Sequence, residues 1–173
     1  MNQNITVIQQ NVDVSTIENE LHEPRIAGLW ESYGSIFYAF KHTETLLLLG
    51  ASTQGSLDEN AFRNNSDVTN YHLNLFPQTA KWLSNNFKNV QRASFIKLFK
   101  GRRVEMHRDV GEYFKNTQRF HLCIQGEYIY RVGEESLHVK PGTLFTFDND
   151  VLHGTQNVKD CDRITLVFDI LRV

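Results

Sequence analysis

The sequence is poor in the residues and patterns that mark several protein classes. Among its 173 residues it has only two cysteines, Cys123 and Cys161, which are too few for a disulfide framework. We therefore expect free thiols in a reducing compartment. The longest strongly apolar run, Leu46–Leu49, is far too short to cross a bilayer, and Met1–Ile5 shows no secretory leader. These absences predict a cytoplasmic protein without a membrane partner.

An excess of charge of either sign is also missing. The net charge is −2 and the isoelectric point is near 6.4, so we expect no surface that follows nucleic acid phosphates. No internal repeat, low-complexity tract or linker divides the chain. Hydrophobic residues make up 40% and charged residues 22%, as is usual for soluble domains. Residues 1–173 are therefore expected to form a single domain with a substantial core.

The N-terminal part, residues 1–92, mixes helical and extended patterns. Two segments repeat apolar residues at helical spacing; one is followed by Pro24, and the other begins with proline, which is favoured at the first helical position. Two short apolar runs predict strands, and a long polar stretch predicts a loop. The predicted helices are Asp13–His22 and Pro77–Phe87, the predicted strands are Ser35–Phe40 and Glu44–Leu49, and the predicted loop is Gln54–Asn70.

From Ala93 onward the chain becomes a series of short strands divided by turn signals such as Gly133-Glu134 and Pro141-Gly142. Two of these segments alternate apolar and polar residues, so each has one face suited to a core. The predicted strands are Phe95–Phe99, Val104–His107, Arg119–Ile124, Glu127–Val132, Ser136–Val139, Thr143–Phe147 and Asp162–Leu171. This pattern predicts a mainly β fold of the α+β type. Residues 93–173 would form a double-stranded β-helix, a cupin-like jelly roll, with the N-terminal helices packed on one sheet.

Three residues in this strand-rich part have the pattern of a metal site. His107 and Asp109 are two apart, so in an extended segment their side chains leave the same face. His153 follows the predicted strand Thr143–Phe147 and can supply a third ligand from a neighbouring strand. Two histidines and one carboxylate form the facial triad of non-haem Fe(II), which leaves coordination positions open. The sequence therefore predicts iron bound by these three residues.

Polar residues on two of the alternating strands are candidates for a second ligand. Arg163 and Thr165 share one face of Asp162–Leu171, and Arg119 and His121 share one face of Arg119–Ile124. The planar guanidinium of an arginine can bind a carboxylate through two parallel hydrogen bonds, and Thr165 could donate one more. His121 is as easily interpreted as a polar core residue that bonds to a neighbour.

The His-Arg-Asp sequence has competing interpretations. A lone His-x-Asp in a strand is more often structural than catalytic. The tripeptide is also found in the catalytic loop of protein kinases, but no asparagine follows at the required offset and no glycine-rich loop precedes it. The addition of His153 and Arg163, in register with a strand-rich half, argues against coincidence.

Six segments between Phe95 and Asp169 form a more specific set. They are Met106-His107-Arg108-Asp109, Arg119-Phe120-His121-Leu122, Val132-Gly133-Glu134-Glu135, Pro141-Gly142-Thr143-Leu144-Phe145-Thr146-Phe147-Asp148, His153-Gly154-Thr155-Gln156-Asn157 and Asp162-Arg163-Ile164-Thr165-Leu166-Val167-Phe168-Asp169. Together they resemble the aspartyl/asparaginyl β-hydroxylase family of Fe(II)- and 2-oxoglutarate-dependent dioxygenases. The resemblance implies Fe(II) bound by the triad, O2 as oxidant and the cosubstrate 2-oxoglutarate. It implies that Arg163 holds one carboxylate of 2-oxoglutarate, with Arg119 and His121 near the other end.

The chain departs from part of that family. Members that act on epidermal-growth-factor-like domains typically lack the metal carboxylate, which Asp109 supplies here, and they carry additional large domains. Bacterial members include hydroxylases of free amino acids, such as proline cis-4-hydroxylases. The resemblance therefore implies hydroxylation of an unactivated C–H in an amino acid or an amino-acid side chain, with a small molecule or a peptide as substrate. Residues 1–92, where the resemblance fades, are expected to shape the substrate mouth.

Two other functions remain open from the sequence. A non-catalytic, cupin-like module could use the same metal site for sensing or binding. A nucleic-acid demethylase of the same superfamily would have a second arginine six residues after Arg163, but Asp169 stands there and the net charge is negative. The oligomeric state cannot be inferred from the sequence.

Overall fold

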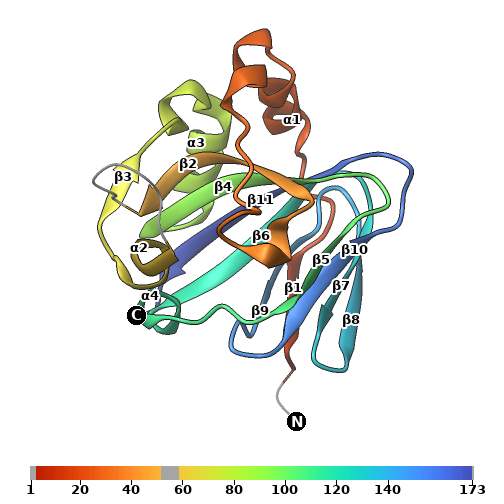
Figure 1. Ribbon diagram of the computed structural model, residues 1–173. Coiled ribbons are helices and arrows are strands. Elements are labelled where there is room, and N and C mark those ends of the chain that lie inside the picture. The colour runs from red at the N-terminus through yellow and green to blue at the C-terminus, as the bar shows by residue number, and fades with distance from the viewer. Residues whose placement is uncertain (1–2, 52–58, 173) are drawn as a thin grey trace.

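Two facing antiparallel sheets form the body of the protein in a computed structural model that describes residues 3–51 and 59–172 (Figure 1). The larger sheet has the strand order β1-β9-β6-β11-β4-β2-β3, and the smaller sheet has the order β5-β10-β7-β8. The strands of the larger sheet are β1 (Ile5–Gln9), β9 (Leu144–Phe147), β6 (Thr117–Gln125), β11 (Arg163–Leu171), β4 (Val90–Leu98), β2 (Thr43–Ala51) and β3 (Val68–Asn70). The strands of the smaller sheet are β5 (Arg103–His107), β10 (His153–Asn157), β7 (Tyr128–Val132) and β8 (Glu135–Val139).

Short helices complete the chain, and two of them cover the outer face of the larger sheet (Figure 1). The α-helices are α1 (Ser15–Leu21), α2 (Glu59–Asn64), α3 (Pro77–Asn86) and α4 (Glu112–Lys115), and the 3-10 helices are η1 (Pro24–Leu29), η2 (Tyr38–Phe40) and η3 (Leu73–Leu75). Ile17 of α1 and Leu83 of α3 are buried in one cluster with Phe95 and Leu166 of the sheet. No helix in the described ranges is long and apolar enough to cross a membrane.

A second core lies between the two sheets. It combines Phe145 and Phe147 of β9 with Tyr128, Tyr130 and Val132 of β7, all of which are at most 3% exposed. Alternation along β6 and β11 separates the two cores. Most of their apolar residues face the helices, and most of their polar residues face the smaller sheet, together with Cys123 and Val167.

The expected jelly-roll architecture, with helices on one sheet, is confirmed. Every predicted strand from Ala93 onward is present, and the Gly133-Glu134 turn joins β7 to β8, with φ of 56° at Gly133. The helix predicted for Pro77–Phe87 forms as α3, and that predicted for Asp13–His22 forms as α1. The N-terminal 92 residues also supply strands to the larger sheet, since β1 pairs with β9 and β2 pairs with β4.

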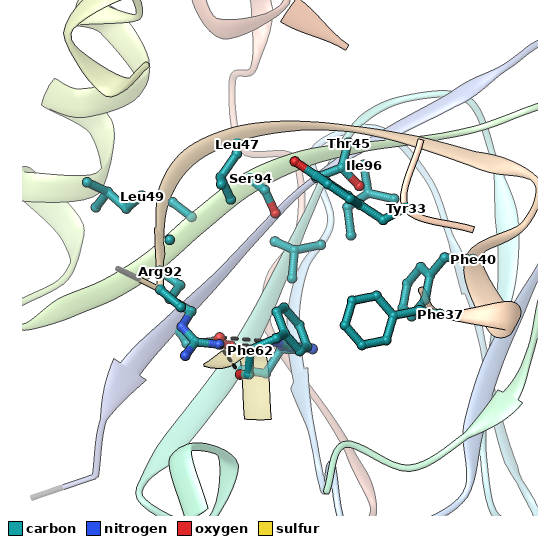
Figure 2. A pocket seen from close by; sticks show the side chains of 16 residues that line it. Tyr33, Phe37, Phe40, Thr45, Leu47, Leu49, Phe62, Arg92, Ser94 and Ile96 are labelled. Atoms are coloured by element: carbon teal, nitrogen blue, oxygen red, sulfur yellow. Dashed lines mark hydrogen bonds and ion pairs between the residues drawn. The ribbon is translucent and has the colours of Figure 1, made fainter. Parts of the chain in front are cut away.

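The predicted strand Ser35–Phe40 is wrong. The backbone turns here, with the N–H groups of Ile36 and Phe37 both donating to the carbonyl of Tyr33, and η2 follows. The aromatic side chains that imitated a strand pattern instead line a cavity in front of β2 and β4, where Phe37 and Phe40 lie side by side (Figure 2).

The predicted loop Gln54–Asn70 is also wrong in part. Its described residues include α2 and the short edge strand β3, while residues 54–58 lie outside the described ranges. The side chain of Arg63 pairs with Glu59 one turn earlier in α2, which favours the helix.

Five further elements were not predicted: the 3-10 helices η1 and η3, the α-helix α4, and the strands β1 and β10. The last of these carries His153 and has no apolar side chain, yet it pairs with β5 on one side and β7 on the other.

Candidate metal centre

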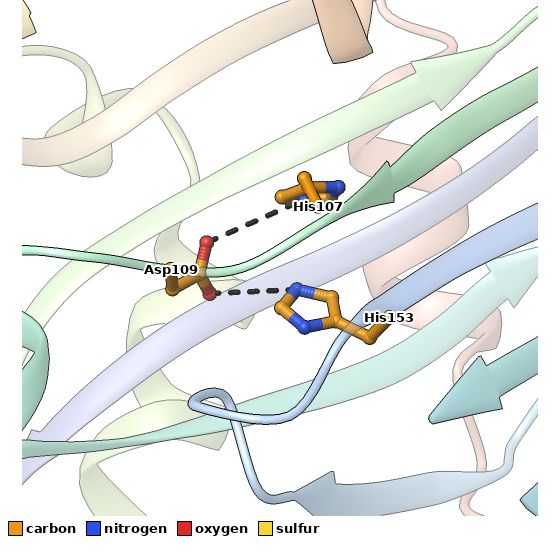
Figure 3. A group of neighbouring side chains, drawn as sticks. All are labelled: His107, Asp109 and His153. Atoms are coloured by element: carbon orange, nitrogen blue, oxygen red, sulfur yellow. Dashed lines mark ion pairs between the residues drawn. The ribbon is translucent and has the colours of Figure 1, made fainter. Parts of the chain in front are cut away.

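The three predicted ligands meet at one end of the smaller sheet (Figure 3). His107, the last residue of β5, lies directly opposite His153, the first residue of β10, and their ring centroids are 4.4 Å apart. Asp109 follows β5, and its N–H donates to the carbonyl of Asn149 at 3.2 Å. One donor atom from each of the three side chains lies within 4.8 Å of the others. Within the described residues this is the one group of His, Cys, Asp or Glu with metal-binding spacing.

Hydrogen bonds to the backbone orient both imidazoles. His107 Nδ1 lies 2.8 Å from the carbonyl oxygen of Glu105, and His153 Nδ1 lies 2.8 Å from that of Val151. A carbonyl only accepts, so each Nδ1 carries the proton and each Nε2 keeps a free lone pair. The two Nε2 atoms lie 3.9 and 3.7 Å from the oxygens of Asp109. The lone pairs needed for a metal thus converge on the carboxylate.

The protonation of the site suits a cation. Burial lowers the pKa of His153 to about 4, although the nearby Asp109 opposes the shift. The ring is therefore neutral at neutral pH, as a metal ligand must be. Two neutral imidazoles and one carboxylate are the donor set that non-haem Fe(II) takes, so these residues fit the metal that the sequence predicts.

Arg119, in β6, joins the triad to the larger sheet. Its Nη1 donates to Asp109 Oδ2 at 2.8 Å, while Nε and Nη2 donate to the two oxygens of Asp169 at 2.8 and 2.9 Å. The hydroxyl of Tyr113 donates a further bond to Asp169 at 3.2 Å. Burial lowers the pKa of Arg119, but attraction by Asp109 and Asp169 outweighs burial and raises the pKa above its ordinary value. Arg119 therefore stays charged and orients the carboxylate of Asp109.

A cavity that we call the triad cavity lies between the two sheets beside these ligands. It holds about 410 Å³ of space that is free of protein atoms, part of which is open to solvent. It is lined by Phe40, Ile96, Val104, His107, Arg119, His121, Tyr130, Phe147, His153, Gly154, Thr155, Arg163 and Val167. The lining is largely apolar, with a few charged and polar groups that can orient a ligand.

Arg163, the first residue of β11, points into the triad cavity and is 3% exposed. Its Nη1 donates to Thr165 Oγ1, which donates to the hydroxyl of Tyr128 at 3.2 Å, and its guanidinium lies 4.5 Å from the centre of the Tyr128 ring. A side chain at Gly126 would place its Cβ 2.8 Å from that of Arg163, so a glycine makes room for the arginine. Arg163 Nε is buried with no partner among the described residues. The guanidinium therefore keeps donors for an anion.

His121 lines the same cavity and is 8% exposed. Its ring packs edge-on against Tyr130, Phe145 and Phe147, with centroids 5.1 to 5.3 Å apart. Burial lowers the pKa of His121 well below 6.5, and Nδ1 has no hydrogen-bond partner among the residues that the structure describes. A purely structural histidine would need a neighbour that bonds to Nδ1, and none of the described residues does so. The neutral ring remains able to contact a ligand.

The structure therefore brings all seven predicted site residues together, in different ways. His107, Asp109 and His153 form the triad, Arg163 and His121 line the cavity, and Thr165 lies behind Arg163. Arg119 also borders the cavity, but it is already paired with two carboxylates.

Two residues of this network were missed. Asp169 lies directly across from Arg119 in the β11–β6 ladder, and Tyr113 comes from the unpredicted α4. The alternation of β11, which places Asp169 on the face of Arg163 and Thr165, was the signal that could have identified Asp169. Asp169 accepts a hydrogen bond from Arg119. A nucleic-acid demethylase would need an arginine at position 169, so this position does not match that alternative.

Comparisons with known proteins agree with this geometry. A sequence profile described as aspartyl/asparaginyl beta-hydroxylase matches residues 10–173. No curated protein matches the sequence.

Two solved structures are similar to this chain to different degrees, and the first supports the fold. An oxidoreductase of the 2OG-Fe(II) oxygenase family from Burkholderia pseudomallei has a TM-score of 0.54 at 11% identity, over 76% of this chain and 69% of that one. A predicted oxalate decarboxylase from Thermotoga maritima has a TM-score of 0.41 at 18% identity, over 53% of this chain and 73% of that one. The family profile spans nearly the whole sequence, and the chain therefore belongs to the aspartyl/asparaginyl β-hydroxylase family.

Proposed function

We propose that the protein is an Fe(II)- and 2-oxoglutarate-dependent dioxygenase. It hydroxylates an unactivated C–H of an amino acid or an amino-acid side chain, in a small-molecule or peptide substrate, and acts in the cytoplasm. The observation that carries the proposal is the convergence of three metal donors within 4.8 Å of one another beside a cavity that holds an incompletely paired arginine.

Iron would be held by His107, Asp109 and His153. When bound, it supplies the chemistry that reduces O2 with two electrons from 2-oxoglutarate, giving succinate and CO2, and two from the substrate C–H, giving the alcohol. One oxygen atom enters succinate and the other enters the substrate. The protein prepares the ligands for this role: carbonyl groups fix the histidine tautomers, and Arg119 fixes the carboxylate.

Arg163 would bind the far carboxylate of 2-oxoglutarate. Its contact with Thr165 and its position over the Tyr128 ring limit the orientation of the guanidinium, which lowers the entropy that binding must remove. Because the side chain is buried, an ion pair made here is weakly screened by salt. His121, whose Nδ1 is without a partner, is the candidate for a contact nearer the reacting end.

The walls of the triad cavity would exclude water from the reaction. Phe147 packs against the ring of His153 at 4.7 Å, and Phe40 packs against that of His107 at 5.1 Å. Ile96 and Val167 line the cavity on the side of the larger sheet. A dry site strengthens the electrostatic contacts inside it and protects reactive oxygen species from side reactions.

The test is succinate release from 2-oxoglutarate with Fe(II), ascorbate and O2, first without any substrate. Many oxygenases show some uncoupled turnover, so we expect a measurable basal rate that disappears in His107→Ala, Asp109→Ala and His153→Ala. Normal activity in one of these variants would remove that residue from the ligand set. Complete silence with intact binding of metal and 2-oxoglutarate would favour the non-catalytic binding module instead.

A further inference from the structure

A second and larger cavity, which we call the apolar cavity, opens beside the triad cavity (Figure 2). It holds about 740 Å³ of space free of protein atoms, part of it open to solvent, and residues of β2, β4, β6 and β11 line it together with Tyr33, Phe37 and Phe62. Phe40, Ile96, Arg119 and Val167 line both cavities. A group bound in the apolar cavity therefore lies next to the space where the metal and the cosubstrate would meet.

Hydrocarbon forms most of its surface. Leu47 of β2 and Val167 of β11 contribute aliphatic groups from the larger sheet. Phe37, Phe40 and Phe62 form an aromatic wall, in which Phe37 and Phe62 lie 4.8 Å apart. Leu47 lies outside the core cluster beneath the helices, although it neighbours Leu46 and Leu48, which belong to that cluster. Its side chain faces the cavity (Figure 2).

The charged groups at the floor are two arginines and two aspartates, and only Arg119 pairs directly with the carboxylates. Arg92 donates to the carbonyl oxygens of Phe62 and Asn65, both at 2.6 Å, and its guanidinium lies 3.4 Å from the centre of the Tyr113 ring. Its Nε is buried with no partner among the described residues. Arg119 is paired with Asp109 and with Asp169, as described above. Two cations thus stand against two carboxylates. These four charges sum to zero, so a substrate carboxylate buried here would leave the region with a net negative charge, which burial makes costly.

The remaining polar groups are neutral. The Tyr33 hydroxyl donates to Glu31 at 2.6 Å, and the hydroxyls of Thr45 and Ser94 lie on the strand wall. Hydroxyl groups can satisfy a peptide or amide group of the substrate, but they do not replace the counter-ion that an acidic side chain needs.

We infer that the substrate places an apolar group, an aliphatic or aromatic side chain, in the apolar cavity, and that the hydroxylated C–H belongs to this group. The inference rests on the proposed dioxygenase activity and specifies its substrate class. It sets this protein apart from members of its family that act on aspartate or asparagine. The reaction converts R–H, O2 and 2-oxoglutarate to R–OH, succinate and CO2, so atoms and electrons balance as in the proposed activity.

The first experiment measures succinate release above the basal rate. It compares probe molecules that share one backbone and differ only in the side chain. The probes are leucine, phenylalanine, aspartate and asparagine, each as the free L-amino acid and as its N-acetyl carboxamide. We expect leucine or phenylalanine to give at least about tenfold higher kcat/KM than either polar residue, a difference that a few buried methylene groups can supply. Higher kcat/KM with aspartate or asparagine, or no stimulation by leucine and phenylalanine above an intact basal rate, would overturn the inference. Absence of the basal rate itself would instead count against the proposed function.

The second experiment changes the cavity. Ser94 lies in the middle of the sheet, paired with Leu47 on one side and Val167 on the other. Ser94→Phe should fill the cavity and abolish the stimulated rate and the binding of the stimulating probe. Val7→Phe adds the same ring at an exposed position of the edge strand β1 and serves as the matched control. Stimulation that survives Ser94→Phe unchanged would contradict the assignment.

A cavity-enlarging variant covers the case in which Ser94→Phe does not fold. Leu47→Ala should shift the preference from leucine toward the larger phenylalanine by several-fold in relative kcat/KM. Because Leu47 lies outside the main core cluster, the protein should tolerate its truncation. An unchanged ratio between the two probes would show that the substrate side chain does not occupy this cavity.

Discussion

Replacement of Asp169 by asparagine tests the role of the buried ion pairs behind the metal site. The side chain of Asp169 is 2% exposed, and it accepts two hydrogen bonds from Arg119 and one from Tyr113. Asp169→Asn keeps the size of the side chain but removes its charge and replaces one acceptor with a donor. Arg119 would then be buried with Asp109 as its sole carboxylate partner among the described residues.

The magnitude follows from burial. Removal of one partner from a buried ion pair costs about 3–5 kcal/mol of unfolding free energy, mostly because the other charge is left without compensation. We expect a loss at the lower end of this range, about 3 kcal/mol, because Arg119 keeps one carboxylate partner, Asp109, at 2.8 Å. In a chain of this length, such a loss corresponds to a fall in Tm of about 6–12 °C.

The assay is urea unfolding of the metal-free protein, followed by circular dichroism. Glu44→Gln is the matched control, because Glu44 and Lys97 form a pair of similar length, 2.7 Å, in the same sheet, but with 33% and 20% of their side chains exposed. An exposed pair contributes about 0–1 kcal/mol. If Asp169→Asn loses no more stability than Glu44→Gln, the reasoning from burial is refuted.

Three further changes test the site directly. Arg163→Ala should weaken the binding of 2-oxoglutarate to the metal-loaded protein by about 2–5 kcal/mol, since a buried charged pair loses one partner; an unchanged Kd in calorimetry would mean that the arginine is misassigned. Burial lowers the pKa of His121, so just below pH 6.5 only the unfolded chain protonates this residue, and the unfolding free energy falls as the pH falls. His121→Phe should make this fall smaller, and an equal fall in both proteins in urea unfolding would contradict the reasoning. Anaerobic Mn(II) at about 100 times its Kd should stabilise the metal-free protein by about 2.7 kcal/mol, and thermal melting should show no such gain in His153→Ala.

The second half of the fold could be predicted because its strands alternate. In β6 and β11 most apolar residues lie at alternate positions that mark the helix-covered face, and most residues between them are polar and face the smaller sheet. Strand β10 could not be found in this way. The sequence His153–Asn157 has no apolar residue, and its conformation is imposed by neighbours on both sides.

The aromatic residues of the first half misled the strand prediction for the opposite reason. Phe37 and Phe40 have high strand propensity, but their rings line a cavity rather than a sheet face. Local propensity does not reveal such a tertiary role. Gly34, which precedes these residues, allows the close approach of the backbone in the turn. A Cβ at Gly34 would lie 2.6 Å from the backbone of Lys41.

The convergence of His107, Asp109 and His153 could be predicted because their spacing encodes their geometry. A two-residue separation places His107 and Asp109 on one side, and a strand predicted shortly before His153 brings that residue close. The role of Arg119 could not be predicted, because it depends on which carboxylates the fold places beside it. Asp109 comes from beyond β5 and Asp169 from β11, and only the packed structure brings both within 2.8 Å of one guanidinium.

That guanidinium has a mechanical consequence. The triad residues belong to the smaller sheet and to the segment that follows its edge strand β5, whereas Arg119 and Asp169 belong to the larger sheet. The salt bridge between Arg119 and Asp109 therefore links the two sheets. A cation bound by the triad would further stabilise this link between the sheets, since metal binding energy adds to folding energy. Backbone amides of β5, an edge strand with a single neighbour, should then exchange with deuterium more slowly when the site is loaded.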